Sequence, residues 1–262
     1  MNAEERAAWL VIVALGTVPW LLLAFYYDSA RRFLGPQRHR AIPWGTPDVA
    51  LLLVLFVPQL ALALIKLFWP EHELRHSLPA TWQIAWLVQF TFPFFLIMAR
   101  GVRPYQMGVH CSRCGRDAVL GLGSFFLSIP LIALAFLAAT LLFEPRRHEV
   151  EKLLRDNPSL ANYALWSISV VIIAPAIEEL LFRGILLPGL ERRFGAWQSI
   201  VGSSSIFALL HVDAWPAPIP LFVLALFLGY LRYRTNGLVA PIVLHAMFNA
   251  ANLAALFLAT RQ

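Results

Sequence analysis

Two adjacent carboxylates stand at the end of a long apolar run in the last third of the chain. The run V-V-I-I-A-P-A-I-E-E-L-L-F-R extends from Val170 to Arg183 and contains Glu178 and Glu179. A charge at membrane depth costs on the order of 3 kcal/mol even on lenient insertion scales. On a helix, Glu179 and Arg183 are four residues apart with the acid first, the favourable order for an ion pair. Glu178 lies about 100° further round the helix, so we expect Arg183 to neutralise Glu179 and to leave Glu178 as a general base.

Pro175 precedes these carboxylates and removes one helix hydrogen bond, so we expect a kink that opens a pocket there. The alternative interpretation is that Glu178, Glu179 and Arg183 form an interfacial cluster at a helix end, where such residues are common.

Two further apolar segments each carry polar side chains. The first holds F-A-L-L-H, which ends in His211 one turn after Phe207, and the second holds H-A-M-F-N from His245 to Asn249. Residues four apart share one helix face. Imidazole and amide groups can stabilise the oxyanion that forms when a carboxylate-activated water attacks a peptide carbonyl. We therefore predict peptide hydrolysis, and the alternative is that these polar groups only join one helix to another.

In this order, the three motifs resemble the signatures of the CAAX-processing and bacteriocin-processing (CPBP) intramembrane proteases. The motifs are E-E-x-x-x-R (Glu178–Arg183), F-x-x-x-H (Phe207–His211) and H-x-x-x-N (His245–Asn249), within about Ser167 to Asn252. The resemblance implies a membrane endopeptidase of about eight helices with a conical cavity. It also implies the role of each site residue: Glu178 activates water with help from His211, His245 and Asn249 stabilise the oxyanion, and Glu179, Arg183 and Phe207 support the site.

The metal requirement stays open at this stage, and the version without a metal is preferred. Glu178, His211 and His245 would also make a plausible set of zinc ligands. A second candidate is the literal H-E-x-x-H of His72, Glu73 and His76. Its setting between two prolines and the presence of Arg75 argue against it. His110-Cys111-x-x-Cys114 is half of a zinc site, so we expect two incidental thiols.

The elements that must hold these groups are membrane helices. Of 262 residues, 59% are hydrophobic and 14% are charged, and the mean hydropathy is +0.67, which does not suit a soluble domain. About eight apolar segments of near spanning length are expected: Ala7–Tyr27, Asp48–Trp69, Thr81–Ala99, Asp117–Phe143, Asn162–Phe182, Trp197–His211, Pro218–Leu231 and Leu238–Ala259. We predict an all-α integral membrane protein, a bundle of about eight transmembrane helices enclosing a polar intramembrane cavity. Residues 1–160 would form the N-terminal spans and residues 161–262 the catalytic spans of one structural unit.

The depths of Glu178 and His211 pose a problem for this arrangement. If the sixth segment starts at Trp197 on the cytoplasmic side, His211 lies near the opposite side. Either Gly184–Phe194 penetrates the membrane as an irregular stretch rich in Gly and Pro, or the sixth segment starts deeper.

The net charge of +6 is attributed to cytoplasmic loops, because no nucleic-acid-binding motif is present. Lys and Arg are more numerous after the first, third, fifth and seventh segments, which places both termini outside, in a bacterial inner membrane. The expected partners are the bilayer and a membrane-anchored or hydrophobic peptide. Rival classes are a membrane binding or immunity protein and a proton-coupled transporter, although no internal repeat supports the latter.

Overall fold

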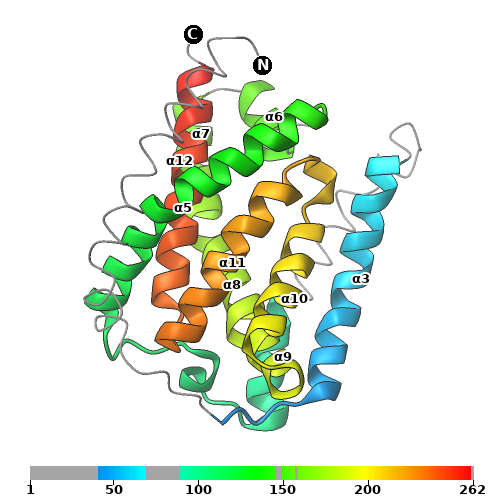
Figure 1. Cartoon of the computed structure of the whole chain (residues 1–262), viewed down its shortest axis with the longest axis vertical. Coiled ribbons are helices and arrows are strands. Elements are labelled where there is room, and N and C mark those ends of the chain that lie inside the picture. Colours follow the sequence, from blue (N-terminus) through cyan, green and yellow to red (C-terminus); the bar gives the residue numbers. More distant parts are fainter. Residues whose placement is uncertain (1–40, 69–88, 146–148, 157–158, 261–262) are drawn as a thin grey trace.

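The computed structural model describes residues 41–68, 89–145, 149–156 and 159–260, which are mostly helical with no strand among them (Figure 1). The first expected segment and the H-E-x-x-H stretch lie outside these residues, and of the third segment only the helical residues 89–100 are described. The helices that form the bundle are α3 (Thr46–Phe68), α5 (Cys114–Leu142), α6 (Glu149–Asp156), α7 (Leu160–Ser167), α8 (Ala174–Glu179), α9 (Leu187–Phe194), α10 (Ala196–Leu209), α11 (Pro218–Thr235) and α12 (Val239–Ala259). The all-helical prediction is confirmed for this part of the chain.

Three of the described helices are long and apolar enough to cross a membrane, at Thr46–Ile65, Cys114–Leu142 and Val239–Ala259. Large apolar side chains are exposed on the outer faces of these helices, among them Val54, which is 62% exposed, and Leu142, which is 75% exposed. Soluble proteins rarely expose apolar surface of this extent. The composition and these helices indicate a membrane protein.

α5, α11 and α12 pack closely against one another on one side of the bundle (Figure 1). Their shared core contains Leu224, Leu228 and Leu244. A Cβ atom added to Gly121 of α5 would lie 2.5 Å from the carbonyl oxygen of Ala240 in α12. Only glycine allows two helix backbones to approach this closely, as is common in membrane bundles.

α3 packs against the helical segment that contains Glu178 and Glu179, on the C-terminal side of these two carboxylates. The indole Nε1 of Trp44, just before α3, donates to the carbonyl of Ile185 at 3.1 Å. Further along α3, the rings of Phe56 and Phe182 stack with their centroids 5.1 Å apart. Residue numbers rise along α3 while they fall along its neighbour, so the two run antiparallel, as Figure 1 also shows.

The structure corrects three expectations drawn from the sequence. The fifth segment does not end at Phe182, because the chain stays helical from Leu160 to Phe194. Gly184–Phe194 is therefore helical rather than irregular, and Gly195 with φ +76° turns the chain back into α10. The expected loop Glu144–Ala161 contains the short amphipathic helix α6.

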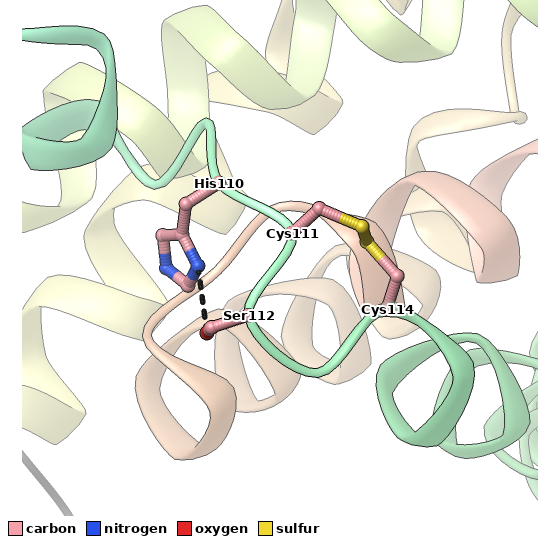
Figure 2. Close-up of a disulfide and its surroundings, with 4 residues drawn as sticks. All are labelled: His110, Cys111, Ser112 and Cys114. Carbon is pink, nitrogen blue, oxygen red and sulfur yellow. Dashed lines mark hydrogen bonds between the residues drawn. A yellow bond between two sulfur atoms is a disulfide. The ribbon is translucent and has the colours of Figure 1, made fainter.

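Cys111 and Cys114 form a disulfide, so the expectation of two incidental thiols is wrong (Figure 2). The turn that leads into α5 brings their Cα atoms to 4.9 Å, inside the range that a disulfide spans. The ring of His110 lies beside this turn, with Nε2 donating to the carbonyl of Asn236 at 3.1 Å. Its Nδ1 must then accept from the hydroxyl of Ser112, at 3.2 Å. These bonds hold the turn against the end of α11.

Candidate active site

The carboxylates lie on a long helix whose regular hydrogen bonding is interrupted twice. Between α7 and α8 the chain forms the π-helical segment η2 (Ile168–Ile173), and between α8 and α9 it forms the π-helical segment η3 (Leu180–Leu186). Short π segments are often found at functional sites. Glu178 and Glu179 lie at the end of the six-residue α8 between these segments.

Each π segment is followed by a proline that leaves one backbone carbonyl without its helical donor. At the end of η2 the N–H of Ala174 bonds to the carbonyl of Ser169, five residues back. In that register, the next N–H would belong to Pro175, which has none, and the carbonyl of Val170 loses its donor. The side-chain amide of Asn249 donates to this carbonyl at 2.8 Å.

The same arrangement recurs at the second π segment. The N–H of Leu187 bonds to the carbonyl of Phe182, so Pro188 leaves the carbonyl of Arg183 without its donor. Here the Nε of Arg232 in α11 donates at 2.8 Å. Membrane helices tolerate prolines where neighbouring groups satisfy the freed carbonyls. At Pro175, where a kink was expected, the structure has the π segment η2, whose freed carbonyl is satisfied from α12, and a second π segment of the same kind precedes Pro188. Sequence reasoning did not assign any role to Arg232, although an Arg at the end of an apolar helix could have indicated one.

Glu179, Arg183 and His245 form a fully buried charged cluster. One guanidinium nitrogen of Arg183 donates to Oε1 of Glu179 at 3.1 Å, and both side chains have 0% exposure. The Nδ1 of His245 lies 2.9 Å from the same oxygen. A second guanidinium nitrogen donates to the carbonyl of Ala225 at 3.1 Å. The structure thus places the predicted Glu179–Arg183 ion pair on α8 and η3 and adds His245 of α12 as a second donor.

Glu178 faces the other nitrogen of the same imidazole. Its Oε2 lies 3.7 Å from Nε2 of His245, and its side chain is slightly more exposed than that of Glu179. Because Nδ1 of His245 faces a carboxylate, it carries a proton, and the neutral ring has its lone pair on Nε2. A lone pair and a carboxylate are both hydrogen-bond acceptors, so at this separation a proton or a water molecule must lie between them.

Phe207 brings the three motifs together. Its ring packs under the guanidinium of Arg183, 4.8 Å from centroid to Cζ. The same ring lies 4.9 Å from the ring of His211 and 5.8 Å from that of His245. The aromatic face stabilises the cation above it, and the same ring contacts both imidazoles.

His211 lies two residues beyond the end of α10 and has a defined tautomer. Its Nδ1 lies 2.8 Å from the carbonyl of Phe207, and a carbonyl only accepts, so the proton is on Nδ1 and Nε2 is an acceptor. The depth problem is resolved by the continuous helix. From Glu178 the chain continues helically to Phe194, turns at Gly195 and returns along α10 over a similar length.

Neither of two cavities between the described helices is the polar cavity expected around Glu178. One cavity of about 400 Å³ lies at the ends of α9 and α11 and is lined by Arg192, Arg232 and Asn236 among others. An apolar groove of about 570 Å³ runs between α7 with η2 and α12. Neither is lined by the charged cluster.

The described residues contain no group of three His, Cys, Asp or Glu side chains placed to hold a metal ion. Glu178 and His245 are neighbours, and the Nδ1 bond from His245 to Glu179 is of the kind that orients metal-bound histidines. His211, the third member of the expected set, does not join them in one ligand group. The residues therefore do not fit the zinc set considered above, and no chemical step is derived through a metal.

The fold and the site define an all-helical membrane protein with acid, imidazole and guanidinium groups buried between its helices. Residues 160–251 match the family model described as "Type II CAAX prenyl endopeptidase Rce1-like". The resemblance drawn from the three motifs is thereby confirmed over this region, which is similar to a family of CAAX prenyl endopeptidases.

One similar protein is an "Uncharacterized 24.3 kDa protein" of Escherichia coli, 31% identical over 114 residues. The match covers 42% of this chain and 52% of that protein, so the chain spans about half the length of this curated relative. No solved structure matches the chain.

Proposed function

We propose that the protein is an intramembrane endopeptidase that hydrolyses peptide bonds of membrane-associated or hydrophobic substrates, with Glu178 as the base that activates water. The observation that supports the proposal is that the two adjacent carboxylates have different partners. Glu179 is held by Arg183 at 3.1 Å. Glu178 is buried beside it, and its nearest charged or polar partner among the described residues is the imidazole Nε2 of His245 at 3.7 Å. A buried carboxylate that is spared from a structural ion pair is suited to accept a proton.

The reaction follows from these positions. Glu178 takes a proton from water while the water oxygen bonds to the carbonyl carbon of the substrate. His245 donates from Nε2 to the oxyanion that forms, and the second amide hydrogen of Asn249, the one not bonded to Val170, assists it. Glu178 then transfers its proton to the leaving amine as the peptide bond breaks. His211 orients the attacking water through the lone pair on Nε2.

The charges of the cluster support this role for His245. Glu178 and Glu179 contribute two negative charges and Arg183 one positive charge. With His245 as an imidazolium, the buried group is neutral, and buried charges are tolerated when they compensate one another. The imidazolium supplies the Nε2–H that the oxyanion requires. This version of the chemistry requires no metal.

The setting supports a substrate from the membrane. The matching family is one of CAAX endopeptidases, and the outer faces of α3 and α5 are apolar. We propose a bacterial inner-membrane location with both termini outside, following the distribution of Lys and Arg.

The experiment compares the purified protein with Glu178→Gln in detergent, using quenched hydrophobic peptides, some of them prenylated. The wild type should cleave, and Glu178→Gln should lose at least about 10³-fold in kcat while its melting temperature holds, because an amide cannot take the proton. Glu144→Gln, an exposed carboxyl in the described chain, is the control and should keep full activity. If Glu73→Gln abolishes cleavage and Glu178→Gln does not, the H-E-x-x-H site is the catalytic one. If the wild type cleaves no peptide, the proposal fails and a binding or immunity protein is favoured.

A further inference from the structure

Two glutamines form a buried amide pair between α3 and the helical residues 89–100. The side chains of Gln59 and Gln89 are 4% and 2% exposed, within otherwise apolar helices. The Nε2 of Gln89 donates to the carbonyl of Leu55 at 3.2 Å and to Oε1 of Gln59 at 2.9 Å. Polar side chains in apolar membrane helices are costly and commonly serve a function. The three catalytic motifs do not include either residue.

The bonds of this pair fix the direction in which Gln59 presents its amide hydrogens. The carbonyl of Leu55 only accepts, so the group of Gln89 that faces it is the NH₂ group. The second hydrogen of that NH₂ faces Gln59, which must therefore present its oxygen to Gln89. The NH₂ group of Gln59 then points away from the pair. Among the described residues it has no acceptor, although it is a strong donor.

The register between α3 and the carboxylate helix brings Gln59 to about the same level along the bundle as Glu178. The Phe56–Phe182 ring stack fixes where the two antiparallel helices meet. One turn further along α3 from Phe56 is Gln59, and one turn back from Phe182 along its own helix is Glu178. Because the helices are antiparallel, both steps lead in the same direction, and each keeps to the face that carries the phenyl ring.

A second element of the candidate site also adjoins α3, namely the turn that follows His211. This turn, η4 (Val212–Ala214), packs directly against α3. α3 therefore adjoins both the helix of Glu178 and the end of α10 that carries His211. A peptide bound at Glu178 would pass α3 at the depth of Gln59.

We infer that Gln59 binds the substrate through its peptide backbone: its Nε2 donates to a backbone carbonyl oxygen of the segment bound beside Glu178, and Gln89 is the positioning residue that holds the amide. The inference rests on the proposed function. A helical substrate has its carbonyls bonded internally and offers no acceptor. The substrate class is therefore a polypeptide segment that is extended, or unwound, at the cleaved bond, whatever its side chains.

The test measures peptide affinity in the inactive Glu178→Gln protein, so that it does not depend on cleavage. The probe is a fluorescein-labelled hydrophobic peptide, and its Kd is measured by anisotropy in detergent. Gln59→Met, which keeps the length of the side chain and removes the donor, should raise Kd about tenfold, equivalent to about 1.4 kcal/mol. In the active protein the same change should lower kcat/KM about tenfold, mainly through KM. Gln89→Met should raise Kd by about threefold, since it frees the Gln59 amide to rotate.

Val57→Ala, on the exposed face of α3, is the matched control and should leave Kd unchanged. An unchanged Kd for folded Gln59→Met would overturn the inference and leave the amide pair as a structural link between two helices. If Gln59→Met does not fold, the Gln59→Met/Gln89→Met double variant, which strands no amide, is measured instead against the same criterion. Failure of the proposed function appears separately, as a wild-type protein that cleaves nothing or a Glu178→Gln protein that still cleaves.

Discussion

His245 and Glu179 are joined by a hydrogen bond of 2.9 Å between the imidazole Nδ1 and the carboxylate Oε1. The bond fixes the ring so that Nε2 faces Glu178 at 3.7 Å. Glu179 is thus the group that connects the motifs: it accepts from Arg183 on its own helix and from His245 on α12. A carboxylate that orients a histidine beside a reacting group acts on the rate without touching the substrate.

Glu179→Gln should lower both activity and stability. The amide cannot compensate the buried guanidinium of Arg183, and breaking a buried pair costs about 3–5 kcal/mol. The imidazolium of His245 also loses its partner, so kcat should fall at least about 100-fold with a smaller change in KM. Thermal unfolding and steady-state kinetics in detergent measure the two effects.

The chain provides a matched control for this variant. Glu151 and Arg155 on α6 are also an acid–base pair four residues apart, but both side chains are about one third exposed. Glu151→Gln should change the free energy of unfolding by less than about 1 kcal/mol, because exposed pairs contribute little. Equal effects of the two variants would show that burial and His245 add nothing to the Glu179–Arg183 pair.

Gly121→Ala should weaken the packing of α5 on α12. The added Cβ would lie 2.5 Å from the carbonyl oxygen of Ala240 and 2.8 Å from Cβ of Val243, and neither can move without shifting the helix. Overpacking of this kind costs about 1–3 kcal/mol. Gly123→Ala, two residues along the same helix, meets no atom within 4 Å, and should stabilise by up to about 1 kcal/mol because alanine favours the helix. Melting temperatures of the two variants in one detergent give the comparison; a lower value for Gly123→Ala than for Gly121→Ala contradicts it.

Periodicity and apolar length predicted the helices well, because both are local properties of the sequence. The prediction failed where hydrogen bonding across helices decides the structure. The segment after Phe182 contains Gly184, Pro188 and Gly189, which locally favour a break. The helix continues there because Arg232 satisfies the carbonyl of Arg183, and because Gly189 packs directly against Val49 of α3. No pattern within residues 184–194 could indicate that Arg232, 49 residues beyond Arg183, supplies this hydrogen bond.

In the candidate site, too, local contacts could be predicted from the sequence and contacts between helices could not. The i, i+4 spacing predicted the Glu179–Arg183 pair, and the structure shows it. The spacing could not tell that His245 would bond to Glu179, since that depends on how α12 packs on α8. Gln59 was overlooked because one amide in an apolar run carries no signal until its neighbours in space are known.

Activity should survive removal of divalent metals. Among the described residues the third expected ligand, His211, does not join Glu178 and His245 in one ligand group. Cleavage rates after dialysis against a strong chelator should therefore stay within about twofold of the untreated protein, whereas loss of a catalytic metal abolishes its chemistry. His245→Gln in the same buffers should be inactive with or without chelator. Inhibition by the chelator that added zinc reverses would establish the metal-dependent version.

Asn249 has two roles in this structure, and the proline that precedes the carboxylates allows them to be separated. Its amide satisfies the carbonyl that Pro175 leaves without a donor, that of Val170, and we propose that it also assists the oxyanion. Asn249→Leu should therefore destabilise the protein by about 1–3 kcal/mol, the cost of an unsatisfied buried carbonyl, and should also lower kcat.

Pro175→Ala restores an N–H at the position whose π-register acceptor is the carbonyl of Val170. In the Pro175→Ala background, Asn249→Leu should then destabilise by much less, because the carbonyl has a backbone donor. The fall in kcat on adding Asn249→Leu should be the same in both backgrounds, at about 10-fold or more, since Pro175→Ala supplies no donor to the oxyanion in place of the lost amide. If the proline substitution rescues kcat as well as stability, Asn249 acts only by bracing the helix, and the oxyanion depends on His245 alone.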